Sequence, residues 1–309
     1  MNFTQYWLEK YSDDSIVGVD CLTYASNKQQ LQVLRQNPKF NFYKKNICDK
    51  EAIEDIFKEE NPDIVVNFAA ESHVDNSIES PDIFIKTNVL GTQILLDASL
   101  KYNVKRFHQI STDEVYGDLP LDSKECFLET SALKPSSPYS ASKAAADLLV
   151  LSYAKTYGLP TTISRSTNNY GRYQHEEKLI PKIIQMMGAG TRIPIYGDGK
   201  NVRDWLHVDD HCRAVDMILR QGKPGEIYNV AANNEMDNLT LTKRILKFLG
   251  GNESQIAFVE DRKGHDRRYS VSAQKLIREL GWRAEVPFES GLQETIEYYK
   301  AKYMAPCTR

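Results

Sequence analysis

The sequence has little that would mark a membrane, secreted or nucleic-acid-binding protein. Its 309 residues contain no apolar run near the roughly 18 residues that a membrane-spanning helix needs. The first residues lack the basic and then apolar pattern of a signal peptide. The net charge is −3, and no basic stripe suited to a nucleic-acid backbone is present. We therefore expect a cytoplasmic protein without a membrane or nucleic-acid partner.

Cysteine is scarce and dispersed. The five cysteines form no Cys-x-x-Cys pair: Cys21, Cys48, Cys126, Cys212 and Cys307. An odd, scattered set is typical of reduced thiols in the cytoplasm rather than of a disulfide framework. His73 and His265 have no metal-ligand spacing with any other His or Cys, so we expect no metal site.

Strand patterns alternate with helical patterns along the first two thirds of the sequence. The strand patterns cover residues 16–20, 64–70, 107–111 and 161–165, and the helical patterns cover 2–10, 88–102 and 140–157. This alternation predicts an α/β fold with a doubly wound, Rossmann-type parallel sheet. The nearly continuous apolar run 64–70 predicts a strand that is buried on both faces.

The rhythm changes after Ser166, where loops become longer and strands shorter. Helical patterns lie near 178–187, 209–220, 239–249 and 289–302, and a short strand covers 226–230. The length allows two domains. We assign residues 1–166 to a dinucleotide-binding domain with returns near 203–231, and residues 167–309 to a smaller substrate domain.

Glycine is absent from the first 17 residues, where a dinucleotide-binding fold needs it. Such a fold begins with a strand, a G-x-x-G-x-x-G turn and a helix whose amino end receives the pyrophosphate. This sequence starts instead at the helical pattern 2–10. The missing strand is central in the usual strand order, so its loss leaves unpaired edges inside the sheet. We expect a truncated version of a longer protein; a degenerate or rearranged relative is the alternative.

Two adjacent acids and a Tyr-x-x-x-Lys pair carry most of the chemistry. Asp113 and Glu114 follow directly after the strand pattern 107–111. Tyr139 and Lys143 are four residues apart, so they share a face at the start of a helix. A lysine ammonium favours the phenolate of a nearby tyrosine, whose ordinary pKa is about 10, and such a tyrosine can take a proton from a substrate hydroxyl. Simple alcohol oxidation needs no additional acid and base.

Neither motif is specific by itself. The sequence contains five such pairs: Tyr6/Lys10, Tyr24/Lys28, Tyr139/Lys143, Tyr196/Lys200 and Tyr298/Lys302. Tyr139 stands out because it follows Pro138 and opens a helix rich in Ala and Ser. On spacing alone, Asp113 and Glu114 fit a solvated turn after a strand equally well.

Further motifs are spread along nearly the whole chain. They are residues 20–25 (DCLTYA), 69–75 (AAESHVD), 87–92 (TNVLGT), 111–117 (STDEVYG), 138–143 (PYSASK), 168–171 (NNYG), 177–181 (EKLIP), 194–199 (PIYGDG), 203–206 (RDWL) and 264–269 (GHDRRY). Together they resemble the nucleotide-sugar branch of the extended short-chain dehydrogenase/reductases, and within it the dTDP-glucose 4,6-dehydratases. The missing glycine-rich turn is the main departure from the family pattern.

The resemblance implies a role for each catalytic candidate. Tyr139 would take the proton of the sugar's 4-hydroxyl while C4 gives hydride to NAD⁺, and Thr112 would hydrogen-bond that hydroxyl. Lys143 would lower the pKa of Tyr139 and bind the nicotinamide ribose. Glu114 would remove the C5 proton, and Asp113 would protonate the departing C6 hydroxyl before hydride returns to C6. The implied cofactor is NAD, and the implied substrate is dTDP-glucose.

The resemblance also implies the binding residues. Those for NAD, besides Tyr139 and Lys143, are Asp20, Leu22, Thr23, Asn46, Ile47, Ala69, Ala70, Thr87 and Asn169. Those for the nucleotide sugar are Ser72, Thr112, Asn168, Lys178, Leu179, Pro194, Tyr196, Arg203, Asn238, Arg262 and His265. Asp20 would hold the adenosine ribose and favour NAD over NADP, and Arg203 would bind the diphosphate. From the residues alone, Asp20 fits an ordinary strand-end acid and Arg203 a surface ion pair.

Three positions depart from the family pattern. Asn46 stands where the family has an Asp that meets the adenine, Arg172 replaces a Pro, and Ser26 replaces a Gly. Asn46 can still accept a hydrogen bond through its amide oxygen. None of the three touches the chemistry that the resemblance implies.

The resemblance further implies a homodimer, whose interface uses the helices 88–102 and 140–157. Two other functions stay open. A nucleotide-sugar 4-epimerase shares the fold and the Tyr–Lys pair but has no use for Asp113 and Glu114. A non-catalytic, truncated relative is the other, and the missing glycine-rich turn is its only support. The sequence does not distinguish dTDP from UDP in the substrate.

Overall fold

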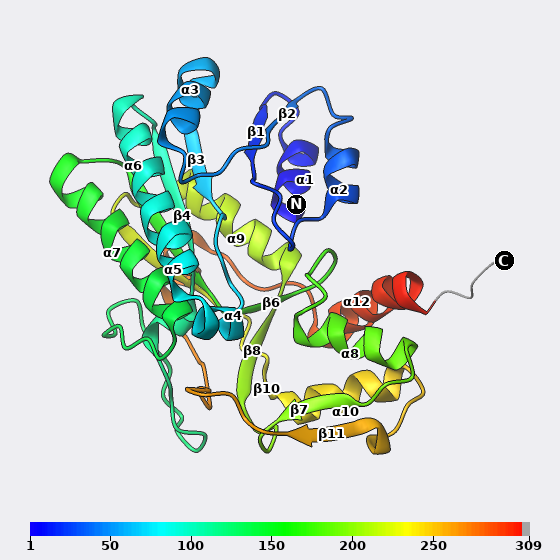
Figure 1. Ribbon diagram of the computed structural model, residues 1–309. Coiled ribbons are helices and arrows are strands. Elements are labelled where there is room, and N and C mark those ends of the chain that lie inside the picture. Colours follow the sequence, from blue (N-terminus) through cyan, green and yellow to red (C-terminus); the bar gives the residue numbers. More distant parts are fainter. Residues whose placement is uncertain (305–309) are drawn as a thin grey trace.

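The computed structural model describes residues 1–304 and shows a parallel sheet covered by helices and joined to a smaller lobe (Figure 1). Cys307 lies outside the described residues. Within them, no helix is both long and apolar enough to cross a membrane.

The first part of the chain, up to residue 166, supplies most of the parallel sheet. Its elements are α1 (Asn2–Lys10), β1 (Ile16–Val19), α2 (Lys28–Leu34), β2 (Phe40–Tyr43), α3 (Lys50–Glu60), β3 (Ile64–Asn67), α4 (Val74–Glu79), α5 (Pro81–Phe84), the π-helical turn η1 (Ile85–Leu90), α6 (Gly91–Lys101), β4 (Arg106–Thr112), the 3-10 turn η2 (Asp113–Tyr116), α7 (Pro138–Tyr157) and β5 (Thr161–Ser166).

The second part builds the smaller lobe and one more strand of the main sheet. Its elements are β6 (Asn168–Tyr170), α8 (Leu179–Gly188), β7 (Ile193–Tyr196), β8 (Val202–His207), α9 (Val208–Gln221), β9 (Glu226–Val230), β10 (Glu235–Asp237), α10 (Asn238–Phe248), the 3-10 turn η3 (Glu253–Gln255), β11 (Ile256–Val259), α11 (Gln274–Leu280) and α12 (Phe288–Tyr303).

The main sheet is divided into two parts. Four strands pair in the order β3-β4-β5-β9, all parallel, and β1 pairs in parallel with β2. Among residues 1–304, β1 pairs only with β2, and β3 pairs only with β4. Each of these two strands therefore has one edge without a sheet partner. The α/β class with parallel strands confirms the predicted fold, and the division lies where the sequence predicted a missing central strand.

The open edge changes the environment of β3. The apolar run 64–70 predicted a buried strand, but the strand ends at Asn67 and Ile64 is 41% exposed. This prediction was wrong because a strand is fully buried only where neighbouring elements cover it. Phe68, just past the strand, is also exposed and packs against Phe3 of α1, with ring centroids 5.4 Å apart.

Helices cover both faces of the four-stranded sheet. Phe107 of β4 and Ile163 of β5 are fully buried in a cluster with apolar residues of α3, α6 and α7. Ile110 of β4 packs in a second cluster with Trp7 of α1 and Val215 of α9. The two clusters follow from the two-residue period of a strand, which sends neighbouring side chains to opposite faces.

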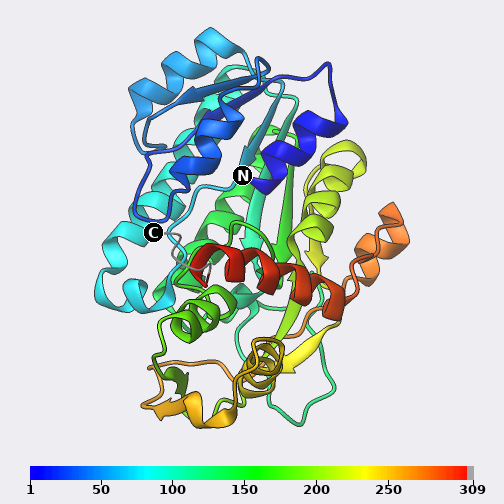
Figure 2. The same cartoon turned by 90° about the vertical axis from the view of Figure 1, so that its right-hand side faces the viewer.

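The smaller lobe has a core of its own. Apolar residues of α8, α10 and α12 pack with β7, which pairs in parallel with β11. Figure 2 shows this lobe beneath the parallel sheet. A further sheet of three strands has the order β10-β8-β6. Within the range 203–231, β9 returns to the main sheet, whereas β8 pairs with β6 and β10.

The helix that leads into the site begins earlier than the predicted 140–157. α7 starts at Pro138 because Ser137 and Ser140 form a capping box, in which each side chain bonds the other residue's backbone N–H. The helix ends at Gly158, whose φ of 70° suits a residue without a Cβ. The predicted helix 88–102 is a continuation of α5 through η1 into α6.

Candidate active site

The two acids lie where β4 ends. The chain turns directly into η2, because the Thr112 Oγ1 accepts a hydrogen bond of 3.2 Å from the Glu114 N–H and caps the turn. The turn closes at Gly117, with φ of 89°, where an added Cβ would come 2.3 Å from the Lys134 carbonyl oxygen. Glycine is therefore required there, and the loop holds both acids at the carboxyl end of the sheet.

Asp113 is buried, so it is not the residue of a solvated turn. Burial and, to a smaller extent, the charge of Glu114 raise the pKa of Asp113 to about 8. Its Oδ1 accepts a hydrogen bond of 3.3 Å from Thr112, and its Oδ2 has no hydrogen-bond partner in the described part of the chain. At neutral pH the carboxyl therefore holds its proton, as a general acid must.

Glu114 is partly exposed and faces several cations. Burial raises the pKa of Glu114, while the charges of Arg203, Lys178 and Arg262 lower it. Adjacent acids in such different surroundings are suited to different proton-transfer roles.

Tyr139 and Lys143 occupy the first two turns of α7, beside the acids, and both are buried. Burial raises the pKa of Tyr139, and so does the charge of Glu114, while a hydrogen bond with Thr112 lowers it. Lys143 Nζ donates a hydrogen bond of 2.7 Å to the Ile110 carbonyl oxygen. Burial therefore changes the pKa of Tyr139 in the direction opposite to the one that the sequence predicts for Lys143.

The predicted NAD-binding residues gather at the carboxyl edge of the sheet. Asp20, Leu22 and Thr23 follow β1, Asn46 and Ile47 follow β2, Ala69 and Ala70 follow β3, Thr87 lies in η1, and Asn169 lies in β6. Asp20 Oδ1 accepts a hydrogen bond of 2.6 Å from the Leu22 N–H, and Asn46 Oδ1 accepts one of 2.9 Å from the Cys48 N–H. These bonds fix the orientation of both side chains.

The fit to a dinucleotide is good at its two ends. The Asp20 carboxylate is exposed at a strand end, as a partner for ribose hydroxyls must be, and the buried Asn169 Oδ1 has no partner among residues 1–304. Lys143 would supply a cation for the second ribose. The described residues include no glycine-rich turn between a parallel strand and a helix that could cradle the pyrophosphate.

Two arginines predicted to bind the nucleotide sugar, Arg203 at its diphosphate, stack on tyrosine rings. Arg203 on β8 lies 4.2 Å from the centre of the Tyr269 ring and donates to the backbone oxygens of Val202 and Asp266. Arg262, in the loop after β11, lies 4.9 Å from the centre of the Tyr196 ring. Arg203 is buried near both acids, so it is not the surface ion pair that its position alone would allow.

The other predicted substrate residues approach from several elements. Ser72 lies before α4, and its carbonyl oxygen accepts a hydrogen bond of 3.2 Å from Lys178 Nζ. His265 Nδ1 lies 2.6 Å from Asp261 Oδ1, and the charges of Arg203 and Arg262 act on the ring. The remaining positions are Asn168 in β6, Leu179 at the start of α8, Pro194 in β7 and Asn238 at the start of α10.

Sequence analysis missed Asp75 and Tyr269. Asp75 forms an ion pair with Arg262, and Tyr269 supports Arg203. Both residues lie inside motifs that the resemblance used, AAESHVD and GHDRRY, and this membership was the available signal.

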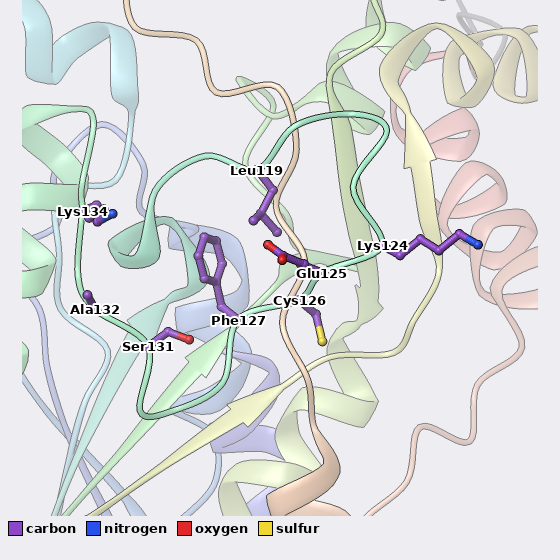
Figure 3. A pocket seen from close by; sticks show the side chains of 8 residues that line it. All are labelled: Leu119, Lys124, Glu125, Cys126, Phe127, Ser131, Ala132 and Lys134. Carbon is purple, nitrogen blue, oxygen red and sulfur yellow. The ribbon is translucent and has the colours of Figure 1, made fainter.

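A hollow of about 490 Å³ beneath the loop after η2 lies apart from these groups (Figure 3). Its lining residues are Leu119, Lys124, Glu125, Cys126, Phe127, Ser131, Ala132 and Lys134. None of them is a candidate catalytic or binding residue.

The fold and the site together define an NAD(P)-type α/β enzyme with acid–base groups at the carboxyl edge of its sheet. Residues 1–295 match the family described as GDP-mannose 4,6 dehydratase, and the chain belongs to this family. The chain is 50% identical over 298 residues to the low-salt glycan biosynthesis protein Agl12 of Haloferax volcanii, covering 96% of this chain and 94% of that protein.

Two further relatives carry a more specific description. The dTDP-glucose 4,6-dehydratase of Salmonella typhimurium is 46% identical over 315 residues, covering 94% of this chain and 87% of that protein. The crystal structure of the dTDP-glucose 4,6-dehydratase DesIV of Streptomyces venezuelae, solved with NAD bound, is similar with a TM-score of 0.93 and 42% identity, covering 99% of this chain and 95% of that chain.

Proposed function

We propose that the chain is an NAD-dependent dTDP-glucose 4,6-dehydratase, which converts dTDP-glucose to dTDP-4-keto-6-deoxyglucose. The observation that carries the proposal is the adjacent pair of acids beside Tyr139, in which the buried Asp113 holds its proton at neutral pH and Glu114 is partly exposed. Elimination of water next to a ketone needs one acid and one base, and this pair supplies both. Relatives at 46% and 42% identity with the same activity support the assignment.

Each candidate residue has its own step in the proposed reaction. Tyr139 accepts the proton of the C4 hydroxyl, which Thr112 hydrogen-bonds. Glu114 removes the C5 proton, which the neighbouring ketone has made acidic, and Asp113 protonates the departing C6 hydroxyl. NAD, held by Asp20 and Lys143, would supply the hydride acceptor for C4 and the hydride donor for C6.

Binding is divided between the two domains, which we place at residues 1–166, with returns near 203–231, and at 167–309. Asp20 and Lys143 hold the two riboses of NAD, and Arg203 and Arg262 hold the diphosphate of the nucleotide sugar. Guanidinium groups suit this role because they donate paired hydrogen bonds to phosphate oxygens.

We also propose that the enzyme is a cytoplasmic homodimer. Apolar side chains on α5, η1 and α7 are exposed in the single chain: Ile83, Ile85, Leu90 and Leu148. An exposed apolar patch on adjacent helices is typical of a surface that another subunit covers.

A 4-epimerase is the competing reaction on the same fold. An epimerase inverts the stereocentre at C4 and eliminates no water, so its reaction does not need a buried carboxylic acid beside a second carboxylate. Incubation of the NAD-loaded protein with dTDP-glucose should yield the 4-keto-6-deoxy product with no net NADH. Clean formation of dTDP-galactose would establish an epimerase instead, and a parallel incubation with UDP-glucose tests the choice of nucleotide.

A further inference from the structure

A buried row of charged side chains lies beneath the catalytic lysine. Asp147 comes one turn after Lys143 on the same face of α7, and its side chain is fully buried. Its Oδ2 accepts a hydrogen bond of 2.8 Å from Nε of Arg165 on β5, which is itself buried. Arg165 thus pairs directly with this carboxylate, and Lys143 lies one turn before it on the same helix face.

Arg165 is fixed from its other side. Its Nη1 donates a hydrogen bond of 2.9 Å to Tyr116 Oη, which in turn donates one of 2.8 Å to Asn229 Oδ1. The guanidinium carbon also lies 4.8 Å from the centre of the Tyr116 ring. Because Arg165 has these partners, it holds the Asp147 carboxylate in one orientation.

The second oxygen of this carboxylate is not used by Arg165. Asp147 Oδ1 and the Ser111 Oγ on β4 are both buried and form no hydrogen bond of good geometry in the described part of the chain, although Ser111 is near enough to lower the pKa of Asp147. A buried carboxylate oxygen without a partner is costly unless a positive charge compensates it. Burial raises the pKa of Asp147, whereas the charges of Arg165 and Lys143 act in the opposite direction and favour the ionised carboxylate.

Lys143 needs such compensation because water does not reach it. Burial lowers the pKa of Lys143 to about 8, and the charge of Asp147 acts in the opposite direction. Lys143 Nζ donates a hydrogen bond to the Ile110 carbonyl oxygen on β4 and lies one turn from Tyr139 on α7. The charges of Glu114, Asp113 and Asp147 each raise the pKa of Tyr139. Asp147 is the carboxylate whose charge favours the ammonium form of Lys143.

We propose that Asp147 is a positioning residue that keeps Lys143 cationic, and that Arg165 fixes the carboxylate in place for this task. The inference rests on the proposed function, in which a charged Lys143 supports proton removal by Tyr139. Asp147 does not itself touch the substrate or the cofactor. It acts through Lys143, so its removal changes the pH at which Lys143 works rather than the shape of the substrate site.

The direct test is the titration of Lys143. Asp147→Asn keeps the size of the side chain and an oxygen for Arg165 but removes the charge. With lysines isotope-labelled at the ε-carbon, the Lys143 resonance is identified by its loss in Lys143→Met. We expect its midpoint in Asp147→Asn to fall by about one pH unit relative to the wild type. Equal midpoints would overturn the proposal.

A matched control separates charge from packing. Tyr116→Phe removes a hydrogen bond from the far side of Arg165, so it disturbs the same buried network while it leaves Asp147 charged. Its Lys143 midpoint should equal that of the wild type. If Asp147→Asn does not fold, the double variant Asp147→Leu/Arg165→Met replaces the pair with apolar groups. Its Lys143 midpoint should also fall, but by less, because the variant removes the cation Arg165 together with the nearer anion Asp147.

The catalytic consequence is read in the first half-reaction. Transient NADH formation in a single turnover with dTDP-glucose needs Lys143 charged, so its rate falls as pH rises through the pKa of Lys143. In Asp147→Asn this fall should occur at lower pH, and an unshifted profile would contradict the proposal. A wild-type protein that forms no NADH from dTDP-glucose would refute the proposed function, while the Lys143 titration still decides the role of Asp147.

Discussion

Arg262 and Asp75 form an ion pair between the smaller lobe and the segment after β3, with an Nε–Oδ1 distance of 3.3 Å. Arg262 Nη2 also donates a hydrogen bond of 3.3 Å to Asp75 Oδ2. In the proposed function, Arg262 binds the diphosphate of the substrate. A carboxylate and a phosphate have the same charge and accept from the same donors, so Asp75 competes with the substrate for Arg262.

Asp75→Asn should therefore tighten the binding of dTDP. The pair is partly exposed, so we expect a gain of about two- to fivefold in affinity, measured by calorimetric titration. Asp82→Asn is the matched control, because Asp82 pairs only with the exposed Lys86 in the same helical segment, among the residues described. Weaker binding by Asp75→Asn would mean that Asp75 holds Arg262 in place for the substrate.

Glu114→Gln should separate the two halves of the reaction. In the proposed function, oxidation at C4 uses Tyr139 and proton removal from C5 uses Glu114, so the variant should oxidise the sugar and then stop. Enzyme-bound NADH should accumulate after dTDP-glucose is added, and its absorbance is the measurement. Tyr139→Phe is the comparison, because it should form no NADH. Equal loss of both half-reactions in folded Glu114→Gln would contradict separate roles.

Asp113→Asn should make the protein more stable at high pH while it reduces dehydration. Burial raises the pKa of Asp113 from 3.8 to about 8, so the folded protein binds this proton more strongly than the unfolded chain does. The stability due to the protonated group is complete below pH 3.8 and is lost as pH rises through about 8. The amide side chain of Asp113→Asn does not ionise, so the variant does not lose this stability as the pH rises.

The measurement is Tm against pH for the wild type and Asp113→Asn. The advantage of the variant should grow from about pH 4 to about pH 8 and then level off, reaching several degrees. A constant difference across this range would show that Asp113 is ionised in the folded protein. Its role as the acid would then be lost.

Leu148→Glu should convert the proposed dimer into a monomer. Leu148 on α7 is 58% exposed, and a charge at its position would have to be buried if another subunit covers this face. Phe258→Glu is the control, because Phe258 is 60% exposed but lies on β11 of the smaller lobe. Light scattering should give half the mass for the first variant and an unchanged mass for the second. Equal masses for wild type and Leu148→Glu would contradict this interface.

Local patterns in the sequence predicted the elements well. The helix at residues 2–10 and the strand at 226–230 have the predicted bounds, because each has a clear apolar period and a turn signal at its end. The prediction that β3 is buried on both faces was wrong, because an apolar run does not reveal whether a neighbouring strand is present. The start of α7 was missed by two residues, because the capping box lies outside the periodic pattern.

The site was less predictable from the sequence than the fold. The sequence predicted that Asp113, Glu114 and Tyr139 lie close together, because the two acids follow a strand and Tyr139 opens a helix only a loop's length later. The pKa shifts could not be predicted, because they depend on burial that many distant residues create. The contact between Asp75 and Arg262 joins residues that are 187 positions apart, and no local pattern reports such a pair.

The open edges of β1 and β3 make the β1-β2 pair a separate unit of local unfolding. With no backbone hydrogen bonds to β3, this pair can open while the four-stranded sheet stays intact. Amide hydrogens in β1 and β2 should therefore exchange faster than those in β4 and β5. Asp20 and Asn46 follow these two strands. In the proposed function, every opening of the pair therefore disrupts the adenosine end of the cofactor site. Bound NAD should slow amide exchange in β1 and β2 more than in the rest of the sheet.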